Sequence, residues 1–408
     1  MVKLLEEFGL AVRNLRRNTG RSLVGILTVA SGVVAFLLAG GFIAWIFQDM
    51  REATIRSQLG HVQIVRPHFF EKGIADPYAF LLPRDSDELA SIETMPGVVS
   101  VTPRLVVSGL ISLGETTVSF AGEGVDPVKE RPISSRMRIV AGTDLDAPDQ
   151  KAVLLGEGLA KGLGARPGDK VVLLATSPGG KTNAVELVVA GTFATVSKEY
   201  DDTAIRVPIA VARKLMRVGG ATSWVVLLDA TEKTAAFVDA TSGQLQSRFE
   251  VVPWTALADF YNKTVVLFNK QVNVVEAIIG LIIVLTISNT LTMSVLERTT
   301  EIGTCLAIGL RQGVVMRMFV MEGLLIGILG GVAGVALGVL AAKGISMIGI
   351  PMPPPPGMAH GYVGRIVVTP ALGVNAMLLA LVTTLLASIL PAWKAGRMNV
   401  VDALRYSQ

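Results

Sequence analysis

The chain has 408 residues, of which 51% are hydrophobic and only 17% are charged, and its mean hydropathy is +0.55. Soluble globular domains carry about a quarter charged residues, so this composition argues against a wholly soluble protein and indicates one embedded in a bilayer. The net charge of +4 comes without a basic stripe on a soluble face, which argues against nucleic-acid binding, and the single Cys305 excludes an intramolecular disulfide.

Residues 1–21 are predicted to form an amphipathic helix at the membrane interface. Apolar side chains recur there at helical spacing, and the charged side chains lie largely on other faces. Such a helix lies with its apolar stripe in lipid and its arginines near anionic headgroups. A cytoplasmic helix docked on protein is the alternative. The apolar positions are Leu4, Leu5, Phe8, Ala11, Val12 and Leu15.

Four windows are apolar enough to cross a bilayer, which takes about 20 residues of helix. They cover residues 22–48, 272–296, 318–343 and 366–393. The first is preceded by arginines, as a signal peptide is, but its uncharged run is too long and no small-residue cleavage site ends it cleanly. We therefore expect four retained spans. Glu276 and Glu322 are the only acidic residues in the windows, each near an end, so no polar pathway through the bilayer is visible.

Lysine and arginine flank these windows on one side. They precede the first window, lie between the second and third, and follow the fourth. With four spans these places fall on the same side, which the positive-inside rule assigns to the cytoplasm. Residues 297–317 and the tail 394–408 are thus expected inside. Residues 49–265 and the loop 344–365 are expected in the periplasm, outside a cell inner membrane.

Residues 49–265 predict a large mixed α+β domain with two lobes. Strand-like runs alternate with helical patterns, and turn residues separate them. The predicted strands are His61–Arg66, Val98–Val107, Thr117–Ala121, Val171–Ala175, Val185–Val189 and Trp224–Leu228. The predicted helices are Asp85–Glu93, Glu157–Leu163, Pro208–Arg217 and Thr231–Arg248.

The third window contains two rows of glycines with members four residues apart. Small residues at this spacing let helix backbones approach closely in a membrane. Packing within the chain is the preferred interpretation, and dimerisation through this face is the alternative. The rows are Gly323, Gly327 and Gly331, and Gly330, Gly334 and Gly338. The proline-rich run Ile350–Gly357 then predicts a stiff, non-helical outer loop.

No catalytic, cofactor or metal site is predicted. The run from Gly179 to Thr182 resembles the end of a phosphate-binding loop, but Ala175 stands where a glycine is required and a strand-like run follows. The three histidines, His61, His68 and His360, form no pattern with cysteine or carboxylates that would bind a metal. Any energy must therefore come from a partner.

The segment between the second and third windows carries a specific motif. It strongly resembles the signature of FtsX-like, MacB-type permeases of ABC transporters, a family that includes LolC-like and LolE-like subunits. The matching residues are Glu297, Arg298, Glu301, Ile302, Gly303, Ala307, Gly309, Phe319 and Glu322. The ending Leu390–Arg405 also resembles that of the family, with Val400 and Asp402 in place of the usual proline and glutamate.

This resemblance implies one span, a MacB-like periplasmic core domain and three further spans. It also implies that residues 297–317 form a coupling helix on a cytoplasmic ABC ATPase dimer, which binds the ATP, while this chain is non-catalytic and has no cofactor. A solvated loop is the alternative. A second permease chain, identical or paralogous, is the implied partner in the bilayer. The implied coupling residues are Glu297, Arg298, Glu301, Ile302, Gly303, Ala307, Gly309 and Arg311.

Three functions remain open within this family. Lipoprotein release is favoured by the overall length and by Gly60–Ile64, which looks LolE-like, although the hairpin near Ser177–Asn183 is short for capturing a lipoprotein carrier. MacB-like export of small molecules or peptides with a periplasmic adaptor is the second. FtsX-like activation of an envelope enzyme is the third. In each, ATP-driven movement is expected to reach the periplasmic domain as a mechanical stroke.

Overall fold

The computed structural model describes residues 9, 11, 13–17, 19–73, 75–195, 197–245, 248–353 and 361–399. The chain forms two compact units. The membrane unit comprises Met1–Phe47, Val265–Pro351 and Val363–Gln408, and the extramembrane unit comprises Gln48–Thr264 and Met352–Tyr362. Much of the predicted N-terminal helix, most of the proline-rich run with His360, and the end of the tail lie outside the described residues.

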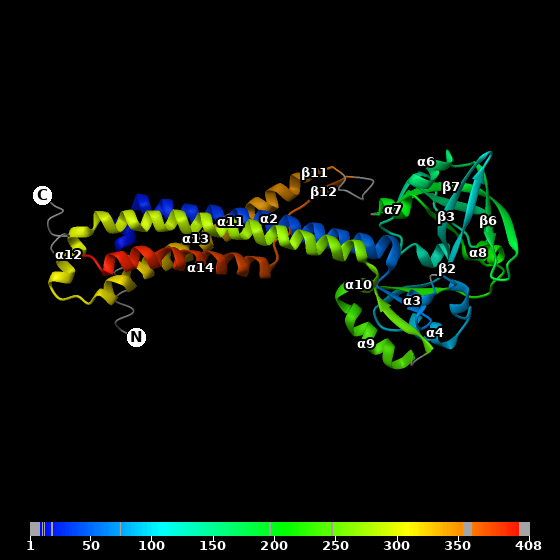
Figure 1. Ribbon diagram of the computed structural model, residues 1–408, viewed down its shortest axis with the longest axis horizontal. Helices are drawn as coiled ribbons and strands as arrows, with labels where there is room; N and C mark the ends of the chain where they lie inside the picture. Colours follow the sequence, from blue (N-terminus) through cyan, green and yellow to red (C-terminus); the bar gives the residue numbers. More distant parts are fainter. Residues whose placement is uncertain are drawn as a thin grey trace. The chain divides into compact units, whose positions relative to one another are not determined.

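Four long apolar helices run side by side in the membrane unit (Figure 1). They are α2 (Thr19–Thr54), α11 (Asp259–Glu297), α13 (Gln312–Ile348) and α14 (Pro370–Gly396). Because hydrocarbon offers no hydrogen-bond partners, a helix that satisfies its own backbone is the stable form for such windows. The prediction of four apolar spanning helices is confirmed. Helix α14 begins four residues later than its window, behind Thr369, whose hydroxyl accepts a hydrogen bond from the Leu372 N–H at 3.2 Å.

These helices bury one apolar side and expose another. Val33, Ile287 and Leu325 pack in their shared core. Leu285 of α11 and Leu340 of α13 point outward and are more than half exposed. Contiguous apolar surface of this extent is unstable in water, so these outward faces are suited to lipid or to the apolar faces of other helices.

The two glycine rows of α13 face two different helices. Gly323, Gly327 and Gly331 meet α14, and Gly330, Gly334 and Gly338 meet α2. A side chain at Gly334 would place its Cβ 2.6 Å from the Cβ of Val33. Larger residues would push the backbones apart and lose the van der Waals contact that holds helices together in lipid. Both rows therefore lie at contacts within one chain.

A ten-stranded mixed sheet is the framework of the extramembrane unit. Its order is β10-β1-β9-β2-β3-β8-β5-β7-β4, with β6 paired to both β2 and β7. The parallel pairs are β3–β8 and β5–β7. Its strands are β1 (Val62–Val65), β2 (Val98–Leu113), β3 (Thr116–Val125), β4 (Arg138–Gly142), β5 (Ala152–Gly156), β6 (Lys170–Thr176), β7 (Thr182–Ala194), β8 (Ala204–Pro208), β9 (Ser223–Leu228) and β10 (Glu250–Pro253). Two further strands, β11 (Ile350–Met352) and β12 (Tyr362–Gly364), form a separate two-stranded sheet.

Short helices connect these strands. They are η1 (Ile55–Leu59), α3 (Phe69–Lys72), η2 (Pro77–Phe80), α4 (Asp87–Glu93), α5 (Pro127–Glu130), α6 (Glu157–Leu163), α7 (Lys198–Asp201), α8 (Ile209–Met216), η3 (Thr231–Lys233), α9 (Thr234–Leu245) and α10 (Trp254–Leu257). All six predicted strands and all four predicted helical segments of this domain are present. Strands β4, β5, β8 and β10 were not predicted.

Strand β2 belongs to two hydrophobic cores. Its first half, up to Arg104, pairs with β9, and its second half pairs with β3 and β6. One core surrounds Trp224 and includes β1, α4 and α9. The other surrounds Leu105 and Leu173 and includes β7, α6 and α8. Strand β2 joins these two cores within one continuous sheet, and the division of the domain into two lobes stays a prediction.

Helix α2 passes directly into the sheet. It is followed by the π-helical turn η1, which ends at Gly60, whose N–H donates to the carbonyl of Ile55 at 2.9 Å. Gly60 has a φ of +65°, and a side chain there would overlap Val225 of β9. Glycine is required because both the backbone conformation and the space exclude a Cβ. Within the extramembrane unit, Gly60 therefore sets the turn between η1 and β1.

His61, the next residue, is fully buried and bonded through both ring nitrogens. Its Nδ1 accepts a hydrogen bond from the Leu228 N–H at 3.0 Å, so Nε2 carries the proton and donates to Thr231 Oγ1, also at 3.0 Å. The Thr231 hydroxyl in turn donates to Glu52 near the end of α2, at 2.8 Å. Burial lowers the pKa of His61 to about 4, which keeps this imidazole neutral.

Acidification is expected to destabilise the extramembrane unit through His61. The unfolded chain binds a proton there near pH 6.5 and the folded chain only near pH 4, so the unfolded state binds more protons between these values and stability falls as pH decreases. The loss by pH 4 should reach at most about 3 kcal/mol. Thermal unfolding of the full chain in detergent measures it. His61→Gln should flatten this part of the pH dependence, and an unchanged profile in that variant would refute the assignment.

Candidate coupling site

The segment between α11 and α13 forms a short helix, α12 (Thr299–Ala307). Arg298 precedes this helix, and its Nη1 lies 3.3 Å from Oε2 of Glu322 in α13. Both residues are only 5% exposed. Taking two charges out of water costs several kcal/mol per ion, and each of them is tolerable here only because the other is present. The pair therefore constrains where α12 begins relative to α13.

One face of α12 packs on the ends of α13 and α14. Ile302 is buried in an apolar cluster with Val315 and Phe319 of α13 and with Ala392 and Ala395 of α14. The small alanines come from the C-terminal motif seen in the sequence. Burial of an isoleucine of this kind contributes about 1.5–3 kcal/mol, so the packing and the ion pair together hold the helix in place.

Two surface ion pairs connect the same segment to the N-terminal part of the chain. Arg17 Nη2 lies 2.6 Å from Glu301 Oε2, and Arg21 pairs with Glu297 at the end of α11. Both pairs are substantially exposed. Solvent-exposed pairs are each worth about 0–1 kcal/mol, so they orient α12 more than they stabilise it.

The end of α12 presents an exposed apolar tip. Ile308 is 82% exposed and Leu310 is 43% exposed, and the exposed Arg311 follows them. Gly309 lies between the two apolar residues with a φ of +99°, which lets the chain turn back sharply into α13. Such residues at a tight turn are available to a protein partner.

The eight residues predicted for coupling divide into two groups. Arg298, Ile302 and Gly303 are buried and support the segment from within, whereas the other five are exposed. Of those, Glu297 and Glu301 are held by arginines, and Ala307, Gly309 and Arg311 lie at or near the tip. Sequence reasoning did not single out Ile308 and Leu310, although they are the large apolar residues next to the predicted Gly309.

A second charged cluster lies in the extramembrane unit, where η1 ends. Arg104 of β2 and Arg206 of β8 are both 1% exposed, and we call them the arginine clamp. Arg206 Nη2 donates to the carbonyl of Ser57 at 2.9 Å, and Arg104 Nη1 donates to the carbonyl of Gln58. Carbonyls at a helix C-terminus have no partners within the helix and carry partial negative charge, so cations are favourable there.

Carboxylates balance the arginine clamp. Arg104 Nη2 lies 2.6 Å from Oε1 of Glu130, which is 4% exposed, and Glu123 lies 3.3 Å from Arg104 Nη1. Burial disfavours the charge on Arg104, but Glu123 and Glu130 outweigh this effect and its pKa lies above the usual value. The clamp thus fixes η1 to strands β2 and β8 of the sheet.

Neither cluster has the composition of a reaction centre. Across the ranges that the structure describes, no group of three or more histidine, cysteine or acidic side chains could hold a metal ion. The two clusters are instead guanidinium–carboxylate contacts that hold helix ends. Contacts of this type fix the position of a helix end relative to its neighbours.

The Arg298–Glu322 pair gives a double-mutant test. Arg298→Met and Glu322→Leu should each destabilise the membrane unit by about 3–5 kcal/mol, because each leaves the other charge buried and unpaired. The double variant should recover most of this loss. Thermal unfolding of the purified full chain in detergent measures all three. Additive losses in the double variant would show that the two residues do not act as a pair.

Two family descriptions match the chain. Residues 22–243 match the MacB-like periplasmic core domain, and residues 273–400 match the FtsX-like permease C-terminal domain. The first match covers α2 and most of the extramembrane unit. The second covers most of α11, α12, α13 and α14, with the coupling segment at its centre.

Curated relatives carry two kinds of name. The macrolide export ATP-binding/permease protein MacB of Rhodospirillum rubrum is 28% identical over 420 residues, which cover 98% of this chain and 60% of that protein. The lipoprotein-releasing system transmembrane protein LolC of Xylella fastidiosa is 27% identical over 341 residues, which cover 77% of this chain and 79% of that protein. The chain thus spans about 60% of the length of the MacB relatives that it matches.

Among solved structures, the periplasmic region of MacB from Actinobacillus actinomycetemcomitans aligns with a TM-score of 0.38 and 14% identity, over 50% of this chain and 94% of that one. The family assignment rests on the two domain matches, because together they include α13, α14, most of α2 and α11, and most of the extramembrane unit. The chain belongs to the FtsX-like, MacB-type permease family of ABC transporters.

Proposed function

We propose that the chain is the non-catalytic permease subunit of a transporter that couples ATP hydrolysis in a separate ATPase to movement of the extramembrane unit. The observation that carries the proposal is the tip of α12. It exposes Ile308 and Leu310, and a buried ion pair and apolar packing hold it at the end of the helical bundle. A partner that pushes on such a tip moves α11 and α13 rather than a loose loop.

Helices α2 and α11 are proposed to carry that movement outward. Each includes residues of both units, since the unit boundaries fall after Phe47 and after Thr264, within α2 and α11 respectively. Gly60 and the arginine clamp hold the turn after α2 against the sheet of the extramembrane unit. In this mechanism the stroke passes along helices, and cargo does not cross the bilayer through the chain.

The proposed partners follow from the same reasoning. A cytoplasmic ABC ATPase dimer binds the ATP and covers the α12 tip. A second permease chain, identical or paralogous, packs in the membrane, which we take to be a cell inner membrane with the extramembrane unit in the periplasm. Helix α11 supports the second chain, because only 17% of its most apolar window is buried, against 39% for α13.

Lipoprotein release is the preferred cargo function. A cavity of about 250 Å³ lies between α2 and α11, with Phe36, Ile43, Phe268 and Val275 among its lining residues. Its lining is almost entirely apolar, which suits an acyl chain. The LolC relatives support this choice by name. Small-molecule or peptide export with a periplasmic adaptor is the second candidate, supported by MacB relatives whose matches cover 98% of the chain.

Changes at the tip should uncouple the ATPase. In full chain copurified with its ATPase, Ile308→Asp should weaken association by at least about 2 kcal/mol, because it places a charge at the centre of the contact. Glu301→Arg and Arg311→Glu should each weaken it several-fold by reversing a charge at the rim. Affinity measured by titration of the ATPase, together with ATP turnover, gives the readout.

Val128→Asp is the matched control, because Val128 is 59% exposed in the extramembrane unit and lies far along the sequence from α12. Glu301→Gln separates charge reversal from simple loss of the Arg17 contact. The coupling assignment is wrong if the Ile308, Glu301 and Arg311 variants all assemble and hydrolyse ATP as the unmodified complex does.

Filling the cavity between α2 and α11 tests the cargo. Val275→Trp occupies the space proposed for an acyl chain and should reduce lipoprotein release from membrane vesicles by at least about tenfold, while ATPase assembly stays intact. Leu386→Trp is the control, since Leu386 is 55% exposed on α14 and does not line the cavity. Normal release with loss of small-molecule export in Val275→Trp would instead favour the second candidate.

A further inference from the structure

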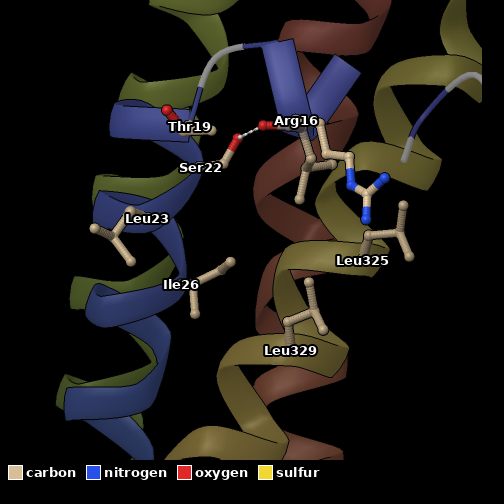
Figure 2. A pocket seen from close by; sticks show the side chains of 8 residues that line it. Arg16, Thr19, Ser22, Leu23, Ile26, Leu325 and Leu329 are labelled. Carbon is tan, nitrogen blue, oxygen red and sulfur yellow. Dashed lines mark hydrogen bonds between the residues drawn. The ribbon is translucent and has the colours of Figure 1, made fainter. Parts of the chain in front are cut away.

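An apolar groove opens near the start of α2, at the end of the bundle that carries α12. Its volume is about 390 Å³, and Figure 2 shows its lining side chains converging from three segments. Arg16 comes from the N-terminal segment, Ser22, Leu23 and Ile26 from α2, and Leu325 and Leu329 from α13. The walls are almost wholly apolar, and the polar groups gather at one end.

The groove forms beside the part of α13 that carries leucines rather than glycines at the groove wall. Further along α13, Gly330, Gly334 and Gly338 let the two backbones touch. On the N-terminal side of Gly330, the residues of α13 at the groove wall are Leu325 and Leu329. Their side chains prevent the backbone contact that the glycines allow. The hydroxyl of Ser22 donates to the carbonyl of Leu15 at 3.1 Å, which holds the N-terminal segment over the open end (Figure 2).

Among the residues that the structure describes, the open end of the groove carries more positive than negative side chains. Arg17 and Arg21 are engaged by Glu301 and Glu297, respectively. Arg16 has no acidic partner among the residues that the structure describes, and its guanidinium reaches from the N-terminal segment toward Leu325 in Figure 2. A guanidinium at the mouth of an apolar groove recognises a group with a negatively charged oxygen, and phosphate matches its donor geometry.

We infer that the groove binds one anionic phospholipid of the membrane leaflet at this end, with the phosphate on Arg16 and the upper part of an acyl chain along Leu23, Ile26 and Leu329. The position of the groove relative to the expected membrane surface favours a phospholipid. The arginines mark the level of the headgroups, and the apolar lining begins within two helical turns of them, as hydrocarbon does below an interface. This inference rests only on the chain lying in a bilayer, and it holds whichever partner or cargo is correct.

A bound lipid at this place would brace the N-terminal segment. That segment carries Arg17, which contacts Glu301 on α12. Occupancy by an anionic lipid offsets the charge of Arg16 and fills the space beneath Leu15, so the segment keeps the position from which Arg17 reaches Glu301. The bound lipid would thus help to hold α12 in place.

Photo-crosslinking identifies the occupant. The full chain, with benzoylphenylalanine in place of Leu329, is reconstituted in vesicles of equal parts phosphatidylglycerol and phosphatidylcholine, irradiated, and examined by mass spectrometry. We expect adducts enriched several-fold in phosphatidylglycerol. The control carries the same probe in place of Leu337, which is 51% exposed on α13 and does not line the groove. Adducts there should reflect the vesicle composition.

Two arginine variants separate the site from general surface charge. Arg16→Gln should reduce the enrichment roughly fivefold, whereas Arg13→Gln, which removes the same charge outside the groove, should leave it nearly unchanged. Arg16→Lys should retain most of it, which controls for loss of structure. Equal effects of the two glutamine variants would overturn the inference, as would equal lipid ratios at both probe positions. A peptide adduct from residues 1–8 or a second copy, or displacement by inorganic phosphate, would also overturn it.

Discussion

The buried pair of Arg298 and Glu322 is the constraint on which the coupling account depends. Neither charge is stable without the other in a site so well shielded from water. Helix α12 is therefore held in one position relative to α13. A buried ion pair adds little net stability, but it specifies geometry. This is the requirement of a surface that transmits movement, since a tip free to shift would absorb a push. The apolar contacts of Ile302 supply the stability that the ion pair does not.

The same physical solution recurs at the outer end of α2. There the arginine clamp binds the carbonyls of Ser57 and Gln58, and Glu123 and Glu130 balance its charge. In both places a guanidinium inside protein fixes the end of a long helix to its neighbour. Glycine has the complementary role, because Gly60 and the rows on α13 permit contacts so close that no side chain fits. Polar contacts at these helix ends and close packing along α13 are consistent with a chain that transmits movement.

Sequence patterns predicted the features of the fold that depend on the composition of short segments. Uncharged windows identified the spans, glycine spacing identified the close contacts of α13, and alternating runs identified the long strands. The sequence did not predict which charged residues are buried against partners distant in the chain. Strand β8 was missed because Arg206 interrupts its apolar pattern, and the partners that make this arginine tolerable, Glu123 and Glu130, are distant in sequence. Arg298 was assigned to a partner surface for the same reason, because no neighbouring residue in the sequence shows that it is buried and paired with Glu322.

Hydrogen–deuterium exchange of the complete complex tests the central claim, that movement at α12 reaches the extramembrane unit. The complex of chain and ATPase is compared with and without bound ATP, and amide exchange is followed in η1 and β1, where the arginine clamp and Gly60 attach α2. We expect ATP to change amide exchange in this region and Glu301→Arg to abolish the change. Identical exchange in both nucleotide states, in a complex that hydrolyses ATP normally, would contradict it.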